Sequence, residues 1–293
     1  QAGVGGPIEN SWATGVSMVD INVDGALDIY VSYVGDYRNK KGHNLLYVNK
    51  GDGAFEEKSA DYGLDLVGFS TQAYFLDYDR DGDLDLFQLN HSIDPAKMGG
   101  KATQRLVQDP LSGDKIFRND GGTFVDVTQE AGINSSKLGY GLSASVGDID
   151  MDGWPDIYVC NDFHEDDYLY LNNGDGTFRV ELRRHMGHTS RFSMGSDLAD
   201  INNDLLPDLL TLDMKPDRED ILKTAEAPES YRIFQYKLSF GYYHQYPHNA
   251  LQINRGAGKF SEVAQMRGID ATDWSWSALF ADFDNDGQKD LHI

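Results

Sequence analysis

One acidic nine-residue motif occurs five times in this chain of 293 residues, and it limits the fold more than any other feature. It reads DINVDGALD from Asp20, DYDRDGDLD from Asp77, DIDMDGWPD from Asp148, DINNDLLPD from Asp200 and DFDNDGQKD from Asp282. Successive starts are separated by 57, 71, 52 and 82 residues. A regular spacing of this size, with insertions, is typical of repeat architectures in which each repeat is one supersecondary unit.

A second motif follows four of the acidic motifs. Apolar residues alternate around an Asn-x-Gly-x-Gly run, as in LYVNKGDGAF ending at Phe55 and LYLNNGDGTF ending at Phe178, and related segments end at Phe124 and Phe260. Asn and Gly accept positive φ, so the run predicts a hairpin turn between two strands. Several short strands per repeat predict an all-β fold, a β-propeller built from four-stranded blades. We expect residues 1–293 to form a single propeller segment.

Two insertions interrupt the repeat, at residues 92–115 and 213–248. The second contains REDILKTAEAPESYRIF, which is rich in Ala and Glu and predicts partly helical structure. Insertions in repeat proteins lie in loops on one face, where binding often occurs.

The acidic motif has the spacing of a calcium loop. Ca²⁺ takes 6–8 oxygen ligands, and short carboxylates at alternate positions converge on one ion when the chain curls. We expect side-chain ligands from positions 1, 3, 5 and 9 and a contribution from position 7, where the backbone carbonyl is the predicted ligand. The predicted ligands are Asp20, Asn22, Asp24, Ala26, Asp28; Asp77, Asp79, Asp81, Asp83, Asp85; Asp148, Asp150, Asp152, Trp154, Asp156; Asp200, Asn202, Asp204, Leu206, Asp208; and Asp282, Asp284, Asp286, Gln288, Asp290. The sequence therefore predicts up to five Ca²⁺ ions.

The EF-hand interpretation of the loops fails, and Mg²⁺ is less suitable for them than Ca²⁺. An EF-hand loop needs a bidentate Glu at its twelfth position, and the five motifs have Val31, Gln88, Val159, Thr211 and Ile293 there. Mg²⁺ dehydrates reluctantly and seldom uses cages made only of protein ligands. The fourth motif departs from the others because Leu205 occupies the sixth position, where they have Gly. We expect that loop to bind most weakly or to fold differently.

The composition excludes two classes of function. The net charge of −23 argues against binding a nucleic-acid backbone, which requires Lys and Arg. The chain has no run of 18 apolar residues, so this segment contains no membrane span. The first residue is Gln1 and no signal peptide precedes it, so we expect a mature chain or a part of a longer protein.

The two motifs together resemble the FG-GAP/VCBS repeats of integrin α-subunit propellers and many bacterial surface proteins. The D-x-[DN]-x-D-G-x-x-D loops followed by L-Y-x-N-x-G-D-G-x-F are most similar to the cartilage-acidic-protein-like group, in which such repeats precede an ASPIC/UnbV domain. The resemblance implies a seven-bladed ring with Ca²⁺ in loops between adjacent strands of a blade, of which this chain is a segment.

Two further segments are candidate sites. Leu238 to Leu251 has no charged residue besides two histidines, and within it Tyr242, Tyr243, His244, Tyr246 and His248 form an aromatic run suited to recognising a sugar or a protein. We expect this run to face a partner, with blade packing as the alternative. The segment NDFHEDD, residues 161–167, is either a catalytic or ligand-contacting cluster or a polar connection between strands.

We expect a non-enzymatic calcium-binding module of a secreted or outer-surface protein, which recognises a glycan or a surface protein. Extracellular Ca²⁺ is millimolar, which suits the weak sites of extracellular modules. The alternative is a Ca²⁺-dependent polysaccharide lyase or a related carbohydrate-active enzyme. Such a lyase needs basic residues beside a uronate, and the 25 Lys and Arg residues against 48 acidic ones argue against it.

Overall fold

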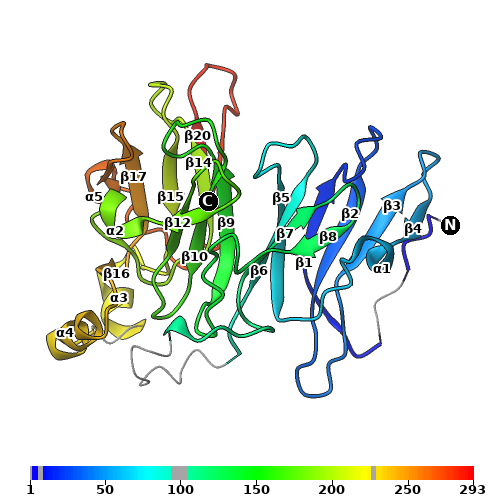
Figure 1. Ribbon diagram of the computed structural model, residues 1–293. Helices are drawn as coiled ribbons and strands as arrows, with labels where there is room; N and C mark the ends of the chain where they lie inside the picture. Colours follow the sequence, from blue (N-terminus) through cyan, green and yellow to red (C-terminus); the bar gives the residue numbers. More distant parts are fainter. Residues whose placement is uncertain (1, 6–8, 94–104, 226–228) are drawn as a thin grey trace. The chain divides into compact units, whose positions relative to one another are not determined.

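The computed structural model describes residues 2–5, 9–93, 105–225 and 229–293. These residues contain four four-stranded sheets, and neighbouring strands in each sheet follow one another in the sequence, apart from a short strand in the second insertion (Figure 1). The paired strands are antiparallel throughout the first, second and fourth sheets. The predicted all-β fold with four-stranded blades is confirmed.

The strands of the first two sheets come from the first half of the chain. The first sheet comprises β1 (Trp12–Val19), β2 (Asp28–Val34), β3 (Leu45–Asn49) and β4 (Phe55–Glu57), followed by the short helix α1 (Ser59–Tyr62). The second sheet comprises β5 (Ser70–Leu76), β6 (Asp85–Asn90), β7 (Lys115–Asn119) and β8 (Phe124–Asp126).

The third and fourth sheets repeat this pattern. The third comprises β9 (Gly141–Gly147), β10 (Asp156–Asn161), β11 (Tyr168–Asn172) and β12 (Phe178–Val180), followed by α2 (Leu182–His185). The fourth comprises β14 (Ser196–Ala199), β15 (Asp208–Thr211), β17 (Ala250–Asn254) and β18 (Phe260–Glu262), followed by α5 (Ala264–Arg267). Two small sheets complete the set: β13 (Thr189–Ser190) pairs in parallel with β16 (Gln245–Tyr246), and β19 (Leu279–Ala281) pairs with β20 (Asp290–His292).

Both sequence motifs occupy the positions in the sheets that the repeat predicts. Each acidic motif connects the first strand of its sheet to the second, for example between β5 and β6, and each Asn-x-Gly-x-Gly run connects the third strand to the fourth. Within each compact unit of the chain, the acidic loops project from one end of the sheets (Figure 1). The repeat therefore places every candidate calcium loop at the same point of a blade.

The chain divides into two compact units. The described residues of Gln1–Asp94, Arg105–Gly141 and Asn172–Phe178 form one unit, and those of Leu142–Leu171 and Arg179–Ile293 form the other. Each unit has its own apolar core, built by alternate residues of the blade strands. The first contains Tyr30, Leu46, Leu86 and Phe117, and the second contains Tyr158, Leu169, Leu209 and Leu251. The expectation of a single propeller segment stays a prediction.

The described residues of the second insertion form two helices, as its composition predicts. They are α3 (Glu219–Ala225) and α4 (Tyr231–Ser239). The side chain of Ser230 caps α4 by accepting a hydrogen bond of 3.3 Å from the backbone nitrogen of Ile233. Both helices lie at the end of the second unit opposite its acidic loops (Figure 1). No helix among the described residues is long and apolar enough to cross a membrane.

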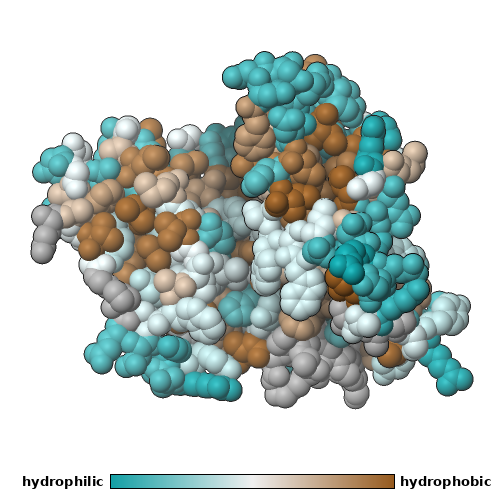
Figure 2. Space-filling model, turned by 180° about the vertical axis from the view of Figure 1, so that it is seen from behind, coloured by the Kyte–Doolittle hydropathy of each residue, from teal (hydrophilic) through white to brown (hydrophobic). Residues whose placement is uncertain are grey.

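Apolar side chains also reach the surface (Figure 2). On β1, Trp12, Val16 and Met18 are each more than half exposed, whereas Ala73, at the position in the second repeat that corresponds to Val16, is buried. Near the end of the chain, Trp274 and Trp276 are exposed as well. These exposed apolar side chains come from β1 and from the segment before β19.

Candidate functional site

Each acidic loop is curled by hydrogen bonds from its own backbone. In the first loop, the two carboxylate oxygens of Asp20 accept from the backbone nitrogens of Asp24 and Gly25, each at 2.9 Å. The third, fourth and fifth loops repeat both bonds at their first aspartate. A curled loop of this kind is what convergence of alternate carboxylates on one ion requires.

In three loops the carboxylates converge. Oxygen atoms from positions 1, 3 and 9 lie within 4.8 Å of one another in the second, third and fifth loops. The groups are Asp77, Asp79 and Asp85; Asp148, Asp150 and Asp156; and Asp282, Asp284 and Asp290. The structure thus brings together the residues that the sequence selected at these positions.

The second and third loops contain carboxylate oxygens that lack a protein partner. Oδ1 of Asp77, Oδ1 of Asp83 and Oδ1 of Asp150 are buried and accept no hydrogen bond. Buried polar atoms are usually paired, so a missing partner at an acidic site points to an unseen ion or water. Asp83 was selected for its backbone carbonyl, and its side-chain oxygen is the orphaned atom.

Burial and mutual repulsion raise the pKa of the carboxylates in these loops. The pKa of Asp79 and that of Asp150 are raised by burial and by the charge of the neighbouring aspartates. Burial raises the pKa of Asp85 to about 7, against hydrogen bonds that favour its charged form. A divalent cation with oxygen ligands would reverse both effects, because it supplies an opposite charge at the point where the carboxylates meet. The residues of these two loops therefore fit Ca²⁺.

The last aspartate of the first, second and fourth motifs has a second role that spacing alone does not reveal. Asp85 is fully buried, and its two oxygens accept from the backbone nitrogens of Tyr78 at 3.0 Å and Asn119 at 2.8 Å. Asp28 and Asp208 make the same pair of bonds in their blades. The ninth residue therefore ties its loop to the third strand of the blade.

The fourth and fifth loops differ from the rest. Leu205 has φ of 68° and its side chain is 80% exposed, so it adopts the left-handed conformation that Gly25 adopts in the first loop with φ of 88°. This conformation is costly for a residue with a Cβ atom. In the fifth loop Asp290 and Phe283 are exposed, whereas the corresponding residues Asp85 and Tyr78 are buried.

The aromatic run of the second insertion is divided between core and surface. Tyr242, Gln245 and His248 are buried. Tyr243 is half-buried: its backbone nitrogen donates to Asp166 at 2.8 Å and its hydroxyl to the carbonyl of Met186 at 2.9 Å. Tyr246 is 40% exposed. Packing therefore accounts for part of the run and leaves Tyr246 as its exposed aromatic ring.

Tyr246 belongs to a group of rings that we call the aromatic face: Tyr231, Phe234, Tyr246 and His248. The ring of Tyr246 is stacked with Phe234 at 6.2 Å and with His248 at 6.3 Å between centroids. Tyr231, three residues before Phe234 on α4, is 75% exposed. His244, also selected from the sequence, lies beside Phe234 with centroids 6.0 Å apart. The structure thus adds α4 residues that the run itself did not indicate.

The NDFHEDD segment connects β10 to β11 and anchors other segments. Asp167 accepts from the hydroxyls of Tyr158 at 2.7 Å and Ser193 at 2.8 Å. Asp166 holds Tyr243, and the carbonyl of Glu165 accepts from Gln245 at 2.8 Å. These contacts fit the polar-connection interpretation, because the carboxylates of Asp166 and Asp167 hold other segments in place.

A buried ionic group that joins the second insertion to Arg191 was not evident in the sequence. Glu229 lies 3.5 Å from Arg191 and 3.7 Å from Lys237, and all three side chains are at most 14% exposed. Burial lowers the pKa of Lys237. These residues belong to no motif and Arg191 lies 38 positions before Glu229, so no sequence signal could have grouped all three.

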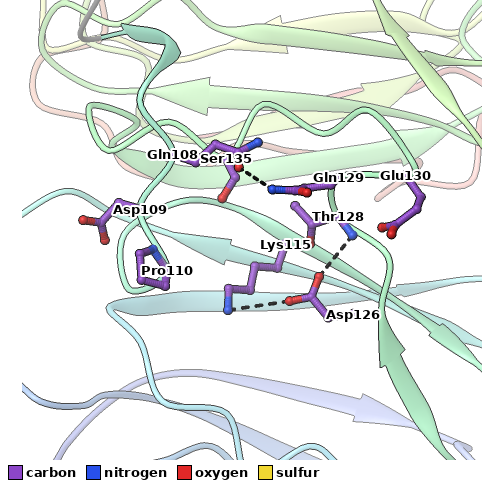
Figure 3. Close-up of a pocket in the computed structure, with 9 residues that line it drawn as sticks. All are labelled: Gln108, Asp109, Pro110, Lys115, Asp126, Thr128, Gln129, Glu130 and Ser135. Atoms are coloured by element: carbon purple, nitrogen blue, oxygen red, sulfur yellow. Dashed lines mark hydrogen bonds and ion pairs between the residues drawn. The ribbon is translucent and has the colours of Figure 1, made fainter.

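The first unit contains a polar pocket of about 470 Å³ beside β7 and β8 (Figure 3). Lys115 faces Asp126 at 3.8 Å, and Gln129 donates to Gln108 at 2.8 Å. Acidic and amide groups line most of it, and the lining residues include no aromatic ring. The pocket offers hydrogen-bonding groups but no stacking surface, and sequence analysis did not predict it.

The family model for the FG-GAP-like repeat matches residues 20–87, 106–159, 148–211 and 239–293. The chain belongs to the FG-GAP-like repeat family. Three of the four matched FG-GAP segments contain a complete acidic loop and the strand after it, so the family model and the blades of the structure share one period. No curated protein sequence matches the chain.

Solved structures that match the chain include a lectin and two lyases. A lectin from Agrocybe aegerita, which recognises non-reducing terminal N-acetylglucosamine, is 17% identical over 97% of this chain and 60% of its own, with a TM-score of 0.50. Rhamnogalacturonan lyase YesW is 14% identical over 69% of this chain and 41% of its own, with a TM-score of 0.36. Exotype rhamnogalacturonan lyase YesX is 11% identical over 96% and 53%, with a TM-score of 0.41. This FG-GAP chain thus spans at most 60% of these proteins, and the lectin supports its fold alone.

Proposed function

We propose that this FG-GAP propeller segment is a non-catalytic, calcium-stabilised module that binds a glycan through the aromatic face. The observation that carries the proposal is the exposed ring of Tyr246, which is stacked with Phe234 and His248. Sugar rings present C–H groups on one face and hydroxyls at the edge. Such a ligand suits an aromatic ring beside imidazole and amide groups.

The surroundings of Tyr246 strengthen the proposal. The stretch from Leu238 to Leu251 has no charged residue besides its histidines, although the chain has a net charge of −23. Centres of binding surfaces are enriched in aromatic residues and depleted in charge. Recognition of N-acetylglucosamine by a lectin of similar fold supports the idea that such a scaffold can present a glycan site.

Calcium has a structural role in this proposal. Asp77, Asp79, Asp81, Asp83 and Asp85 would hold one ion in the second loop and Asp148, Asp150, Asp152 and Asp156 one in the third, with weaker sites in the other loops. A bound ion neutralises carboxylates that otherwise repel one another. The role suits a secreted or outer-surface protein, since calcium is millimolar outside cells. The same proposal includes a relationship of this chain to cartilage-acidic-protein-like and integrin propellers. It also includes a seven-bladed ring of which the chain is a segment.

A glycan array with the full chain in millimolar Ca²⁺ tests the proposed function. We expect binding to a subset of glycans, lost in Tyr246→Ala and Tyr231→Ala. Tyr236→Ala is the matched control, because Tyr236 is also exposed on α4 but packs on Phe240 at 4.3 Å and not on Tyr246. Equal glycan binding by all three variants would refute the role of the aromatic face. Binding of a surface protein that carries no glycan would show that the partner is a protein and not a glycan.

The lyase alternative stays a prediction, and one assay separates it from the binding module. A lyase acting on uronic-acid polymers produces unsaturated ends that absorb ultraviolet light. Incubation with rhamnogalacturonan and other uronate polymers would give no increase in absorbance if the chain only binds. An increase that depends on Ca²⁺ would favour the enzyme.

A further inference from the structure

Two histidines and a glutamate meet at one end of the fourth blade. His188 precedes β13, His248 precedes β17, and Glu262 is the last residue of β18. A ligand-capable atom of each lies within 4.8 Å of the other two. The strand register places this group at the end of the blade opposite its acidic loop, since Thr211, the last residue of β15, pairs with Ala250.

Backbone pairing and one side-chain bond bring these residues together. Gln252 on β17 pairs directly with Glu262 on β18. The amide nitrogen of Gln252 donates to the carbonyl of His188 at 2.8 Å, which fixes the segment before β13 against the blade. The rings of His188 and His248 have centroids 5.5 Å apart. The grouping therefore depends on the sheet and not on the conformation of a free loop.

The hydrogen bonds of His248 and Glu262 leave one ligand atom available on each. Nδ1 of His248 lies 2.6 Å from the carbonyl oxygen of Asn249. A carbonyl only accepts, so Nδ1 carries the proton and Nε2 keeps its lone pair. Oε1 of Glu262 accepts from the backbone nitrogens of Ala264 at 2.6 Å and Leu251 at 3.3 Å, which leaves Oε2 directed at His188.

His188 provides the second, independent observation. Its Nε2 atom is buried and forms no hydrogen bond, and it lies 3.6 Å from Oε2 of Glu262. This separation is too long for a good hydrogen bond but suits two ligands of one small ion. Metal bonds of about 2.0–2.1 Å to each atom would enclose an angle of about 120°, close to that of a tetrahedral site.

We propose that His188, His248 and Glu262 form a transition-metal site of the Zn²⁺ type, distinct from the calcium loops. Two imidazoles and one carboxylate are a ligand set that proteins use for zinc, with a fourth position open to water or another ligand. Ca²⁺ prefers oxygen ligands only, so the two kinds of site select different ions. The backbone carbonyl that holds Nδ1 of His248 is the kind of outer contact that orients metal-binding histidines.

A bound ion would join three segments next to the aromatic face. It would link the strand pair β13–β16 to β17 and β18, and the ring of His188 already packs against Tyr246 with centroids 5.0 Å apart. The competing explanation is an ion pair between protonated His188 and Glu262. An ion pair binds no metal, so direct measurement of metal binding distinguishes the two.

Titration of the full chain with Zn²⁺ in saturating Ca²⁺ tests the proposal by calorimetry and elemental analysis. We expect one equivalent of Zn²⁺ that Ca²⁺ does not displace, bound at least tenfold more weakly in His188→Gln, His248→Gln and Glu262→Gln. His43→Gln is the control, because His43 lies in the first unit, and it is expected to bind as the unmodified chain does. Co²⁺ in place of Zn²⁺ is expected to give the visible absorption of a tetrahedral site, lost in the same three variants.

The variants need a check that they remain folded. Glu262→Gln retains the oxygen that accepts from Ala264 and Leu251, so it is the variant expected to keep its circular dichroism spectrum and calcium content. Zn²⁺ binding of unchanged strength in folded Glu262→Gln would overturn the proposal. Complete displacement of Zn²⁺ by Ca²⁺ would also overturn it, because the ion would then occupy the acidic loops.

Discussion

The side-chain amide of Asn254 donates a hydrogen bond of 3.0 Å to the backbone carbonyl of Ile149, which lies 105 positions earlier in the chain. Asn172 makes the equivalent bond, of 2.8 Å, to the carbonyl of Tyr78. In both cases the donor begins the hairpin turn of one repeat. The acceptor is the second residue of the acidic motif in the repeat before it. In the third and fourth blades, one asparagine thus supports the acidic loop of the repeat before it.

Replacing Asn254 with Ala is expected to lower the free energy of unfolding by about 1–3 kcal/mol. The change leaves the buried carbonyls of Ile149 and Pro207 without a donor and removes the acceptor for Gly256. Urea unfolding at constant Ca²⁺ measures the difference. Asn173→Ala, which removes a bond to Thr177 in an exposed turn, is expected to change stability by less than about 0.5 kcal/mol. Equal effects of the two changes would contradict the supporting role of Asn254.

Replacing Leu205 with Gly is expected to tighten calcium binding in the fourth loop. The substitution relieves the left-handed backbone at φ of 68° and removes no packing, because Leu205 is exposed. The gain is about 0–1 kcal/mol, since relief of strain is partly offset by the greater freedom of Gly in the unfolded chain. Calorimetric titration with Ca²⁺ checks it. Leu206→Gly, at a neighbour without positive φ, is expected to weaken the loop, so improvement by both would point to a cause other than strain.

Calcium is expected to stabilise the chain through its second and third loops. At a Ca²⁺ concentration one hundred times Kd, each occupied site contributes about 2.7 kcal/mol to the free energy of unfolding. Melting in chelator and in millimolar Ca²⁺ shows the effect as a higher Tm. Asp150→Asn is expected to remove most of the increase in Tm that Ca²⁺ binding to the third loop produces, because Asp150 carries a buried oxygen without a partner. Asp175→Asn, in an exposed turn, serves as the control, and a Tm that ignores Ca²⁺ would count against the calcium loops.

Asp114 is expected to make stability depend on pH. It is buried, and burial raises its pKa from 3.8 to about 7 despite a hydrogen bond of 3.0 Å from the backbone of Asn90. Between about pH 4 and 7 the native chain therefore binds more protons at this residue than the unfolded chain does. The contribution of Asp114 to the free energy of unfolding is therefore greatest at the acidic end of this window. It falls as pH rises, by at most about 1.4 kcal/mol per pH unit.

Asp114→Asn keeps the acceptor for Asn90 and removes the titration. The free energy of unfolding of this variant is expected to fall less than that of the unmodified chain between pH 5 and 7, as urea unfolding at the two values would reveal. Parallel pH profiles for the chain and Asp114→Asn would refute this source of the dependence.

Substitutions at Tyr243 and Tyr246 are expected to have different effects, the first on the stability of the fold and the second on glycan binding. Tyr243→Ala removes the hydroxyl bond to Met186 and the ring packed under Arg183, with an expected loss of about 1–3 kcal/mol. Tyr246→Ala should leave the Tm nearly unchanged while it abolishes glycan binding. Thermal melting of both variants provides the comparison. A large stability loss in Tyr246→Ala would show that its ring is required for packing.

The repeat and the type of loop could be predicted from the sequence because both depend on local chemistry. Alternating carboxylates around a turn, as in Asp77 to Asp85, specify a curled acidic loop through bonds within a few residues. Alternation of apolar residues around Asn172 likewise specifies a hairpin. Such patterns depend on neighbours in the chain, so the blade, its loop and the helices of the second insertion follow from the order of residues.

Only the tertiary structure decided which members of each pattern are exposed and which distant residues meet. Tyr242 and Tyr246 belong to one aromatic run, yet packing buries the first and exposes the second. His188 and Glu262 are 74 positions apart and share no motif, and strand register brings their side chains to 3.6 Å. Local patterns fix backbone conformation, whereas contacts between distant side chains depend on the pairing of strands that no single segment encodes.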